Sequence, residues 1–271
     1  MRTPAAALSS WYSSRPRSRY PGLARPVIPS HEVSGVVRGL GENARGLSTG
    51  QEVYGLIAFD RNGAAAGYVT VPAADVADRP RSVSHEQAAS LPLAALTAWQ
   101  ALTDHASLQP GERVLVQGGA GGVGVYAIQL AAILGADITA TGHAGQGDFV
   151  RSLGARTFTE DAGEVRGGFD VVVDTVGGPA LEASYGLARR GGRLVTLSAP
   201  PSAQRAEQLG IHAVTFVVTP DAAQLARLAE LTDSGRLRPV VSQVFPLREG
   251  REAFESGTRP RPPGKTVVLV R

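Results

Sequence analysis

The sequence predicts an α/β fold in which a doubly wound parallel sheet follows a shorter β-rich region. From Arg113 onward, short apolar runs alternate with helical segments, the pattern of parallel strands joined by right-handed crossovers. The run Val171-Val172-Val173 indicates a strand that is buried on both faces. Before residue 80, glycines separate short β-rich runs at a spacing typical of an antiparallel barrel or sandwich.

The N-terminal third divides into an irregular part, a β-rich part and a helix. Residues 1–30 are rich in proline and show little periodicity, so no regular element is expected there. Strands are expected between the glycine turns, at 32–37, 52–57 and 68–71. An alanine- and leucine-rich helix is expected over 86–102, with a kink at Pro92.

In the remainder of the chain strands and helices alternate. Strands are expected at 113–117, 137–141, 169–175, 193–198 and 213–218, and helices at 122–134, 148–153 and 221–234. The last helix has a clear start, because Asp221 can cap it and Gln224 follows three residues later. The chain then returns to strand character at 240–245 and 266–270.

The composition excludes several kinds of chemistry. The 271 residues include no cysteine, which excludes disulfides, thiolate nucleophiles, iron–sulfur clusters and cysteine-bearing zinc sites. The formal net charge is +3, and Lys265 is the only lysine. The sequence contains no block of five like charges. Nucleic acid and anionic membranes are therefore not expected as partners. The order of polar and apolar residues over 1–20 is wrong for a signal peptide, so a cytoplasmic location is expected.

A glycine motif at 119–124 carries the functional prediction. Its sequence, Gly-Ala-Gly-Gly-Val-Gly, satisfies GxGxxG between a predicted buried strand and a predicted helix, the context of a Rossmann dinucleotide-binding site. Glycines allow the backbone to approach a pyrophosphate closely, and the helix N-terminus favours negative charge. The residues expected at the cofactor are therefore Gly119, Gly121, Gly122, Val123 and Gly124. The alternative is a glycine turn that binds no ligand.

The end of the second strand of the α/β region indicates which dinucleotide binds. A carboxylate about 20 residues after the glycines would bind the ribose 2′-hydroxyl of NAD. Here the strand ends Thr-Ala-Thr-Gly-His over 139–143, and the first carboxylate is Asp148. This small polar end leaves room for a 2′-phosphate and predicts NADPH, with Thr141 and His143 as its neighbours and Arg151 as a further source of charge. Equally, His143 could be a solvated loop residue.

Further motifs are spread over most of the chain: LPLAALTAWQAL at 91–102, PGERVLV at 110–116, DTVGG at 174–178, GGRLV at 191–195 and GKTVVL at 264–269. Together with the glycine loop they resemble the medium-chain dehydrogenase/reductase superfamily, from about residue 29 to the C-terminus. The nearest branch is the zinc-independent, zeta-crystallin-like quinone oxidoreductases. The resemblance implies a GroES-like substrate domain, a Rossmann domain for NADPH, and a homodimer.

The resemblance also assigns segments and site residues. It implies a partial GroES-like β domain at 1–90, an NADP-binding Rossmann domain at 91–240, and a return to the substrate domain at 241–271. The cofactor-binding residues that it implies are Thr97, Thr175, Val176, Gly177 and Ser198 on the nicotinamide side, with Phe216 and Val217 near the carboxamide. Three of them have structural alternatives: Thr97 could pack its helix, Thr175 could end a buried strand, and Phe216 could belong to the core.

Two features depart from the family pattern. Ser30-His31-Glu32 occupies the place of a Gly-His-Glu motif whose histidine binds catalytic zinc in zinc-dependent members. Because those sites also need cysteine, no metal is expected here, and His31 is expected to be packed or hydrogen-bonded. The segment before Pro29 is shorter than in family members, which either an open substrate lobe or a gene start placed too far downstream would explain. Trp11, Tyr12 and Tyr20 fall near the place of the family's substrate-cleft aromatics.

A site without metal favours hydride addition to an acceptor that is already electrophilic. The predicted activity is NADPH-dependent reduction of a small quinone or α,β-unsaturated carbonyl, with hydrogen bonds stabilising the developing enolate or quinol. The proton comes from solvent or from a tyrosine, for which Tyr54, Tyr12 and Tyr20 are candidates, although each could be a packed aromatic. Two other functions stay open: an enoyl reductase of polyketide-like thioesters, and a catalytically silent nucleotide-binding or scaffold protein.

Overall fold

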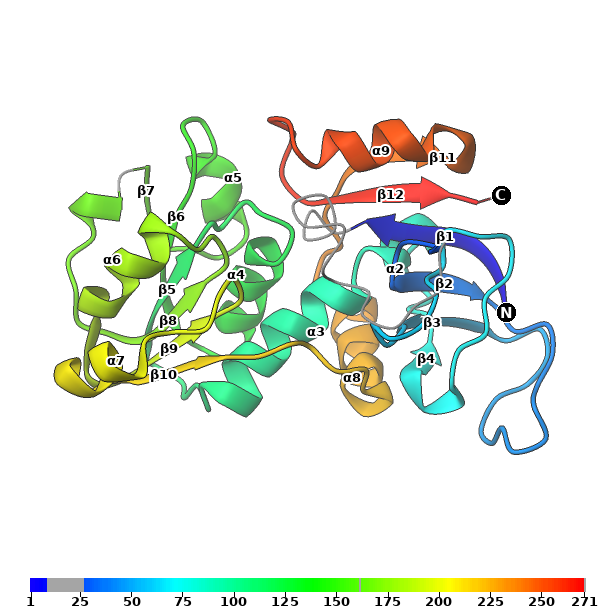
Figure 1. Cartoon of the computed structure of the whole chain (residues 1–271), viewed down its shortest axis with the longest axis horizontal. Helices are drawn as coiled ribbons and strands as arrows, with labels where there is room; N and C mark the ends of the chain where they lie inside the picture. Colours follow the sequence, from blue (N-terminus) through cyan, green and yellow to red (C-terminus); the bar gives the residue numbers. More distant parts are fainter. Residues whose placement is uncertain (9–26, 161, 271) are drawn as a thin grey trace. The chain divides into compact units, whose positions relative to one another are not determined.

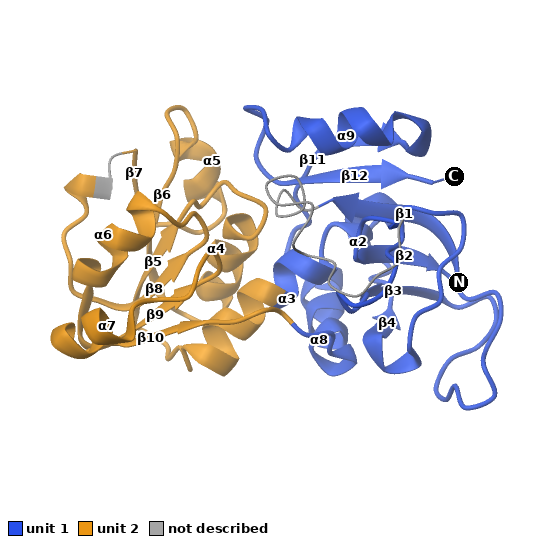
Figure 2. Ribbon diagram, in the orientation of Figure 1, with its two compact units in different colours: residues 1–96, 219–271 blue, residues 97–218 orange. Residues whose placement is uncertain are grey.

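The structure is a computed structural model of the chain that describes residues 1–8, 27–160 and 162–270 (Figure 1). The chain divides into two compact units (Figure 2). Unit 1 comprises residues 1–96 and 219–271, and unit 2 comprises residues 97–218. Each unit is built on one six-stranded sheet, so the predicted combination of an α/β part and a separate β part is confirmed.

The sheet of unit 2 is parallel throughout, with the strand order β10-β9-β8-β5-β6-β7. Its strands are β5 (Arg113–Gln117), β6 (Asp137–Thr141), β7 (Thr157–Thr159), β8 (Phe169–Asp174), β9 (Ala188–Thr196) and β10 (His212–Thr215). The order reverses between β5 and β8, and ligands bind at such a switch point in doubly wound sheets. The five strands expected from the sequence are present, and the three-residue β7 is an additional one.

The helices of unit 2 follow its strands. They are α4 (Gly124–Ile133), α5 (Gly147–Ser152), α6 (Pro179–Leu187) and α7 (Ala203–Leu209). Helix α4 packs against β5 and β6, and α6 packs against β8 and β9. Helix α3 (Pro92–Gln100) begins in unit 1 and ends in unit 2, whose first residue is Thr97, and a π-helical turn, Ala101–His105, follows it. No helix among the described residues is long and apolar enough to cross a membrane.

The sheet of unit 1 has the order β11-β12-β1-β2-β3-β4 and is antiparallel except between β11 and β12. Its strands are β1 (Arg2–Leu8), β2 (Glu32–Val36), β3 (Glu52–Leu56), β4 (Val76–Asp78), β11 (Val241–Pro246) and β12 (Lys265–Leu269). The unit also contains α2 (His85–Ala89), α8 (Ala222–Asp233) and α9 (Gly250–Ser256). Pro92 begins α3 after a break, so the single helix expected over 86–102 is two helices.

The prediction of an irregular segment over 1–30 is wrong at its start, because β1 lies in the middle of the sheet between β12 and β2. Ala5, Ala6 and Ala7 of this strand are completely buried. Alanine is a poor strand former by itself, but packing of both faces of the strand outweighs that preference here. The strand expected at 68–71 is also absent, since Tyr68 forms only an isolated bridge to Arg2.

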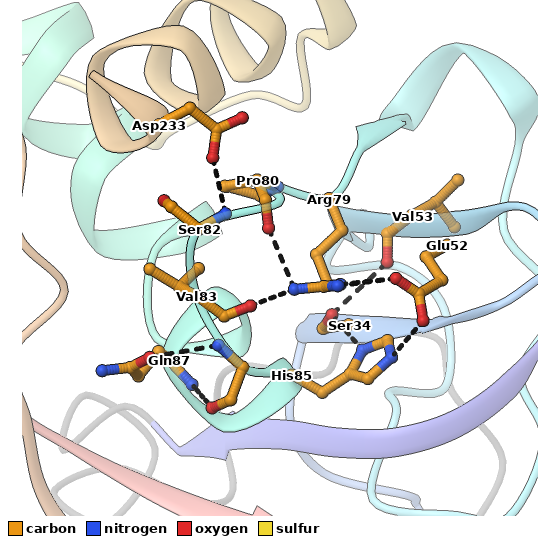
Figure 3. Close-up of polar contacts among 11 residues, drawn as sticks. Ser34, Glu52, Val53, Arg79, Pro80, Ser82, Val83, His85, Gln87 and Asp233 are labelled. Carbon is orange, nitrogen blue, oxygen red and sulfur yellow. Dashed lines mark hydrogen bonds and ion pairs between the residues drawn. The ribbon is translucent and has the colours of Figure 1, made fainter. Parts of the chain in front are cut away.

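Helix α8 belongs to unit 1. The chain therefore re-enters unit 1 at residue 219, earlier than the expected residue 241. The helix packs against β4, and the hydroxyl of Tyr54 donates to the carbonyl oxygen of Leu225 at 2.6 Å. Asp233 accepts a hydrogen bond from the backbone of Ser82 at 2.8 Å (Figure 3). The predicted cap is confirmed, because the Asp221 side chain accepts from the backbone of Gln224. Strand and helix periodicity cannot show against which sheet a helix packs.

A polar cluster joins β2, β3 and the start of α2 within unit 1 (Figure 3). The guanidinium of Arg79 donates to Glu52 Oε2 at 2.6 and 3.1 Å and to the carbonyl oxygen of Pro80 at 2.9 Å. The Nδ1 atom of His85 lies 2.7 Å from Ser34 Oγ, and its Nε2 atom lies 3.5 Å from Glu52 Oε1. The imidazole of His85 therefore links two strands.

This cluster predicts a pH dependence of stability. Burial, followed by the charge of Arg79, lowers the pKa of His85 from its ordinary value of 6.5, and Glu52 opposes that change. The unfolded chain then binds a proton at a pH where the folded protein does not, so lowering the pH through the ordinary histidine pKa favours unfolding. We expect the melting temperature of the wild type to decrease between about pH 7.5 and about pH 5.5, and to decrease less in His85→Gln.

Thermal unfolding followed by circular dichroism at several pH values measures this difference. Burial also lowers the pKa of His31, so the comparison between the two proteins isolates His85, whereas the wild-type slope alone does not. Equal slopes in the wild type and His85→Gln would contradict the prediction.

Candidate functional site

The glycine loop, residues 118–124, connects the end of β5 with the start of α4. Its backbone is hydrogen-bonded to the neighbouring strand end, because Gly119 N donates to the carbonyl oxygen of Thr141 at 2.8 Å. Within the loop, Gly121 N donates to the carbonyl oxygen of Gly118 at 3.0 Å, and Gly118 has a φ of 77°. These contacts turn the chain sharply at the carboxyl edge of the sheet.

Packing explains why glycine is required in this loop. A Cβ atom at Gly124 would lie 2.1 Å from the carbonyl oxygen of Gly118, and a Cβ atom at Gly119 would lie 2.8 Å from Cδ1 of Ile128. Gly121 is exposed, and the next two residues are half-buried at the N-terminus of the ten-residue helix α4. An accessible glycine backbone at a helix N-terminus suits the pyrophosphate of a dinucleotide. The residues present therefore fit this cofactor.

The residues expected near the adenosine ribose have different environments. Thr141 is buried, and its hydroxyl donates to Gln117 Oε1 at 2.6 Å and accepts from Gly118 N at 3.3 Å. His143 is exposed at the end of β6. Arg151 lies 3.2 Å from Asp148 in an exposed ion pair, so its charge is shared with that carboxylate. Thr141 thus helps to hold the glycine loop, while His143 is accessible to a ligand.

The turn after β8 contains three of the residues expected on the nicotinamide side. The hydroxyl of Thr175 donates to the carbonyl oxygen of Gln117 at 2.7 Å. Val176 is 57% exposed, which is unusual for a large apolar side chain beside a buried strand. Gly177 has a φ of 82°, and a Cβ atom there would lie 2.6 Å from Cβ and Oγ of Ser198. The structure therefore brings this turn and Ser198 together.

Asp174 is a residue of this site that the sequence reasoning missed. Its side chain is completely buried, and Oδ1 accepts from Val176 N at 3.1 Å and from Gly177 N at 2.9 Å. Its Oδ2 atom accepts from the hydroxyls of Thr196 at 2.8 Å and Ser198 at 3.1 Å. An acidic residue directly after the apolar run Val171-Val172-Val173 is a signal that could have identified it.

The remaining residues expected at the cofactor lie on α3 and after β10. Thr97 is buried on α3. Phe216 is half-buried, and its ring centroid lies 4.1 Å from that of His105. Val217 is 61% exposed, so a second apolar side chain in unit 2 is accessible next to this aromatic pair.

Of the tyrosines expected to supply a proton, Tyr12 and Tyr20 lie outside the described residues, as does Trp11. Tyr54 is completely buried, and its hydroxyl proton is donated to the backbone of α8. Burial, with a smaller contribution from Asp233, raises the pKa of this hydroxyl. The environment of Tyr54 suits a structural role, because the hydroxyl proton is already donated and water has no access to it.

The surroundings of His31 do not fit a catalytic zinc site. Its Nδ1 atom lies 3.0 Å from the carbonyl oxygen of Ile57 and 3.2 Å from that of Ala58, and burial lowers its pKa. The adjacent Glu32 pairs with Lys265 at 2.5 Å. Catalytic zinc needs three protein ligands, but in the part of the chain that the structure describes no three His, Asp or Glu side chains are placed to hold a metal, and cysteine is lacking. The packed, hydrogen-bonded environment expected for His31 is the one observed.

A parallel sheet in this order, with a glycine loop at its switch point, defines a dinucleotide-binding α/β unit. Two family models match the chain: "Alcohol dehydrogenase GroES-like domain" over residues 8–81 and "Zinc-binding dehydrogenase" over residues 134–268. The chain belongs to the medium-chain dehydrogenase/reductase superfamily.

Relatives of the chain include proteins named as oxidoreductases and a polyketide synthase protein. The chain is 31% identical to the mitochondrial NAD(P)H oxidoreductase RTN4IP1 of Danio rerio over 90% of its own length and 72% of that protein. It is 35% identical to 2-methylene-furan-3-one reductase of Solanum lycopersicum, over 90% of the chain and 63% of that enzyme. A spectinabilin polyketide synthase protein, NorB of Streptomyces orinoci, is 35% identical over 88% of the chain but only 12% of its own length. The chain is therefore similar over most of its length to NAD(P)H oxidoreductases.

Solved structures agree with this assignment. The quinone oxidoreductase of Coxiella burnetii superposes with a TM-score of 0.88 at 29% identity, covering 100% of this chain and 89% of that one. A mycobacterial protein complexed with NADPH superposes with a TM-score of 0.86 at 28% identity, covering 99% of this chain and 90% of that one.

Proposed function

We propose that the protein transfers a hydride from NADPH to a quinone or an α,β-unsaturated carbonyl without a metal. The observation that carries the proposal is the glycine loop at the switch point of the parallel sheet, combined with a donor set around His31 that does not suit zinc. The names of two similar proteins, a quinone oxidoreductase and a 2-methylene-furan-3-one reductase, support this acceptor class, because a 2-methylene-3-one is an α,β-unsaturated carbonyl.

Different residues of unit 2 bind different parts of the cofactor in this proposal. When bound, NADPH supplies a hydride to a conjugated acceptor. We assign the pyrophosphate to the backbone of Gly121 to Val123 and the nicotinamide side to Thr97, the turn 175–177 and Ser198. The exposed Val176 and Val217 offer apolar surface that can exclude water from the ring. The hydroxyl of Tyr54 is committed to the backbone, so in this proposal the proton comes from solvent, with Tyr12 and Tyr20 as the alternatives.

The preference for NADPH over NADH follows from the end of β6. No carboxylate lies in the segment Thr139 to Gly147 that would bind a 2′-hydroxyl and repel a 2′-phosphate. The exposed His143 offers a ring nitrogen as a hydrogen-bond donor. The NADPH complex of a similar mycobacterial protein supports this choice.

The test is a titration of both cofactors followed by turnover. We expect NADPH to bind at least about tenfold more tightly than NADH, and NADPH to be oxidised when a naphthoquinone is added. Activity is expected to survive prior treatment with a chelator. Equal affinities would contradict the cofactor preference, and loss of activity on chelation would contradict the metal-free reaction.

Two results of the same experiment would point to other functions. Binding of NADPH without oxidation of any acceptor favours a catalytically silent nucleotide-binding protein. Turnover of a crotonyl thioester in preference to the quinone favours an enoyl reductase, a second candidate that the match to a polyketide synthase protein supports. Failure to bind either dinucleotide would reject both enzyme proposals. A cytoplasmic location and a homodimeric state stay predictions.

A further inference from the structure

We propose that Asp174 is a positioning residue that fixes the hydroxyl of Ser198 as a hydrogen-bond acceptor toward the carboxamide N–H of the bound dinucleotide. This inference rests on the proposed function and deepens it, because one buried carboxylate then determines which hydrogen bond the site offers to the nicotinamide end. It concerns unit 2 alone.

The position of Asp174 follows from the sheet register. Gln117 at the end of β5, Asp174 at the end of β8 and Thr196 at the end of β9 are paired across neighbouring strands. The glycine loop begins immediately after Gln117, so Asp174 lies in the strand next to the proposed pyrophosphate site. Ser198 follows β9 by two residues and is half-buried, whereas Asp174 is completely buried.

The four hydrogen bonds to Asp174 use its two carboxylate oxygens for different purposes. Oδ1 accepts from the backbone of Val176 and Gly177, which fixes the turn after β8. Oδ2 accepts from the hydroxyls of Thr196 and Ser198, which fixes the segment after β9. One carboxylate therefore holds both segments that we assign to the nicotinamide side, and an ionised carboxylate can accept all four bonds.

This arrangement determines whether the Ser198 hydroxyl can donate a hydrogen bond to a ligand or only accept one. A hydroxyl has one proton and two acceptor lone pairs, and the Ser198 hydroxyl lies 3.1 Å from Asp174 Oδ2 and 3.1 Å from Thr196 Oγ1. Because Thr196 donates its own proton to Asp174, the Ser198 proton is donated either to Asp174 directly or to Thr196, which Asp174 orients. Toward a ligand it can then only accept. The nicotinamide carboxamide carries N–H donors, whereas an acetyl group in the same position keeps the carbonyl oxygen and has no donor. Ser198 should therefore distinguish these two groups.

The experiment compares the binding of NADPH and of its 3-acetylpyridine analogue by titration. We expect the wild type to bind NADPH about tenfold more tightly than the analogue, the effect of about one hydrogen bond. In Ser198→Ala the two affinities should differ by less than about threefold. In Asp174→Asn the side-chain amide can donate a hydrogen bond to the Ser198 oxygen. The hydroxyl proton of Ser198 is then available to the ligand, so the preference for NADPH should be lost or reversed.

Ser152→Ala serves as the matched control, because Ser152 is an exposed serine of unit 2 on α5, far along the chain from Asp174 and Ser198. It should keep the wild-type ratio. If Asp174→Asn does not fold, as judged by circular dichroism, Ser198→Ala alone decides. A purely structural role would weaken both ligands equally and leave the ratio unchanged. That result, or equal affinities in the wild type, would overturn the inference while the proposed function stands, whereas binding of neither dinucleotide by the wild type would overturn both.

Discussion

Replacement of Gly124 by alanine is expected to weaken NADPH binding and turnover by about a hundredfold or more. The new Cβ atom would lie 2.1 Å from the carbonyl oxygen of Gly118 and 2.9 Å from Cα of Gly119. These are backbone atoms of the glycine loop, directly after β5, and cannot rotate away, so the loop must move relative to α4. A displacement of about 1 Å misaligns the groups that we assign to the pyrophosphate. The overpacking itself should cost about 1–3 kcal/mol in the free energy of unfolding.

The matched control is Gly186→Ala in α6. Gly186 is exposed, it lies within a helix, and a Cβ atom there would meet no atom within 4 Å. Alanine has the higher helix propensity, so this variant should keep wild-type binding and gain slightly in stability. Cofactor titration and urea unfolding of both variants measure the two effects. Wild-type affinity in Gly124→Ala would show that the glycine loop does not hold the cofactor.

The second large effect concerns the buried ion pair of unit 1, Glu32 with Lys265. Their side chains are only 1% and 4% exposed, and the Nζ and Oε2 atoms lie 2.5 Å apart. Glu32 Oε1 also accepts a hydrogen bond from Leu93 N at 3.1 Å. Lys265→Met is expected to lower the free energy of unfolding by about 3–5 kcal/mol, because it leaves a buried carboxylate without its cation.

The loss should depend on pH in a defined direction. Burial already raises the pKa of Glu32, and Lys265 is the main influence that lowers it again. Without Lys265, the folded protein keeps Glu32 protonated, and the pKa of Glu32 in the folded state lies above its value in the unfolded chain. The Lys265→Met variant should therefore be most stable below the ordinary glutamate pKa and should lose stability as the pH rises above it. Urea unfolding between about pH 4.5 and about pH 7.5 measures this slope.

Two further variants separate the pair from a general effect of charge. Glu32→Gln with Lys265→Met should recover most of the lost stability, because no unpaired charge is then buried. Arg248→Met removes a cation from an ion pair whose side chains are 81% and 42% exposed, and it should change stability little. A Lys265→Met protein as stable as the wild type at neutral pH would contradict the role of the pair.

Local patterns in the sequence predicted those parts of the fold that form through local interactions. The strand, glycine loop and helix around residues 113–134 are one such case, and the Asp221 cap of α8 is another, since its partner Gln224 lies three residues away. Strand β1 was missed because the burial of three alanines, and not their intrinsic preference, makes it a strand. The placement of α8 in unit 1 depends on contacts with residues that precede it by more than 140 positions.

The candidate site divides in the same way. Gly119 and Gly124 could be identified from their spacing, because the shape of the loop depends on the residues within it and next to it. Asp174 could not be assigned its role from the motif DTVGG alone, since its partners Thr196 and Ser198 are 22 and 24 residues away. Similarly, the motif around His31 suggested a metal ligand by its position, and only its contacts with Ile57 and Ala58 show the packed ring.

The sequence by itself determined the alternation of strands and helices after residue 113, the dinucleotide motif and, through the lack of cysteine, the exclusion of cysteine-bearing zinc sites. The tertiary structure alone decided which polar groups meet: Asp174 with Ser198, Glu32 with Lys265, and Tyr54 with the backbone of α8. The physical reason is the range of the interactions. Turns, caps and periodicity depend on neighbours along the chain, whereas a buried polar side chain is satisfied by whichever strand or helix the sheet register brings beside it.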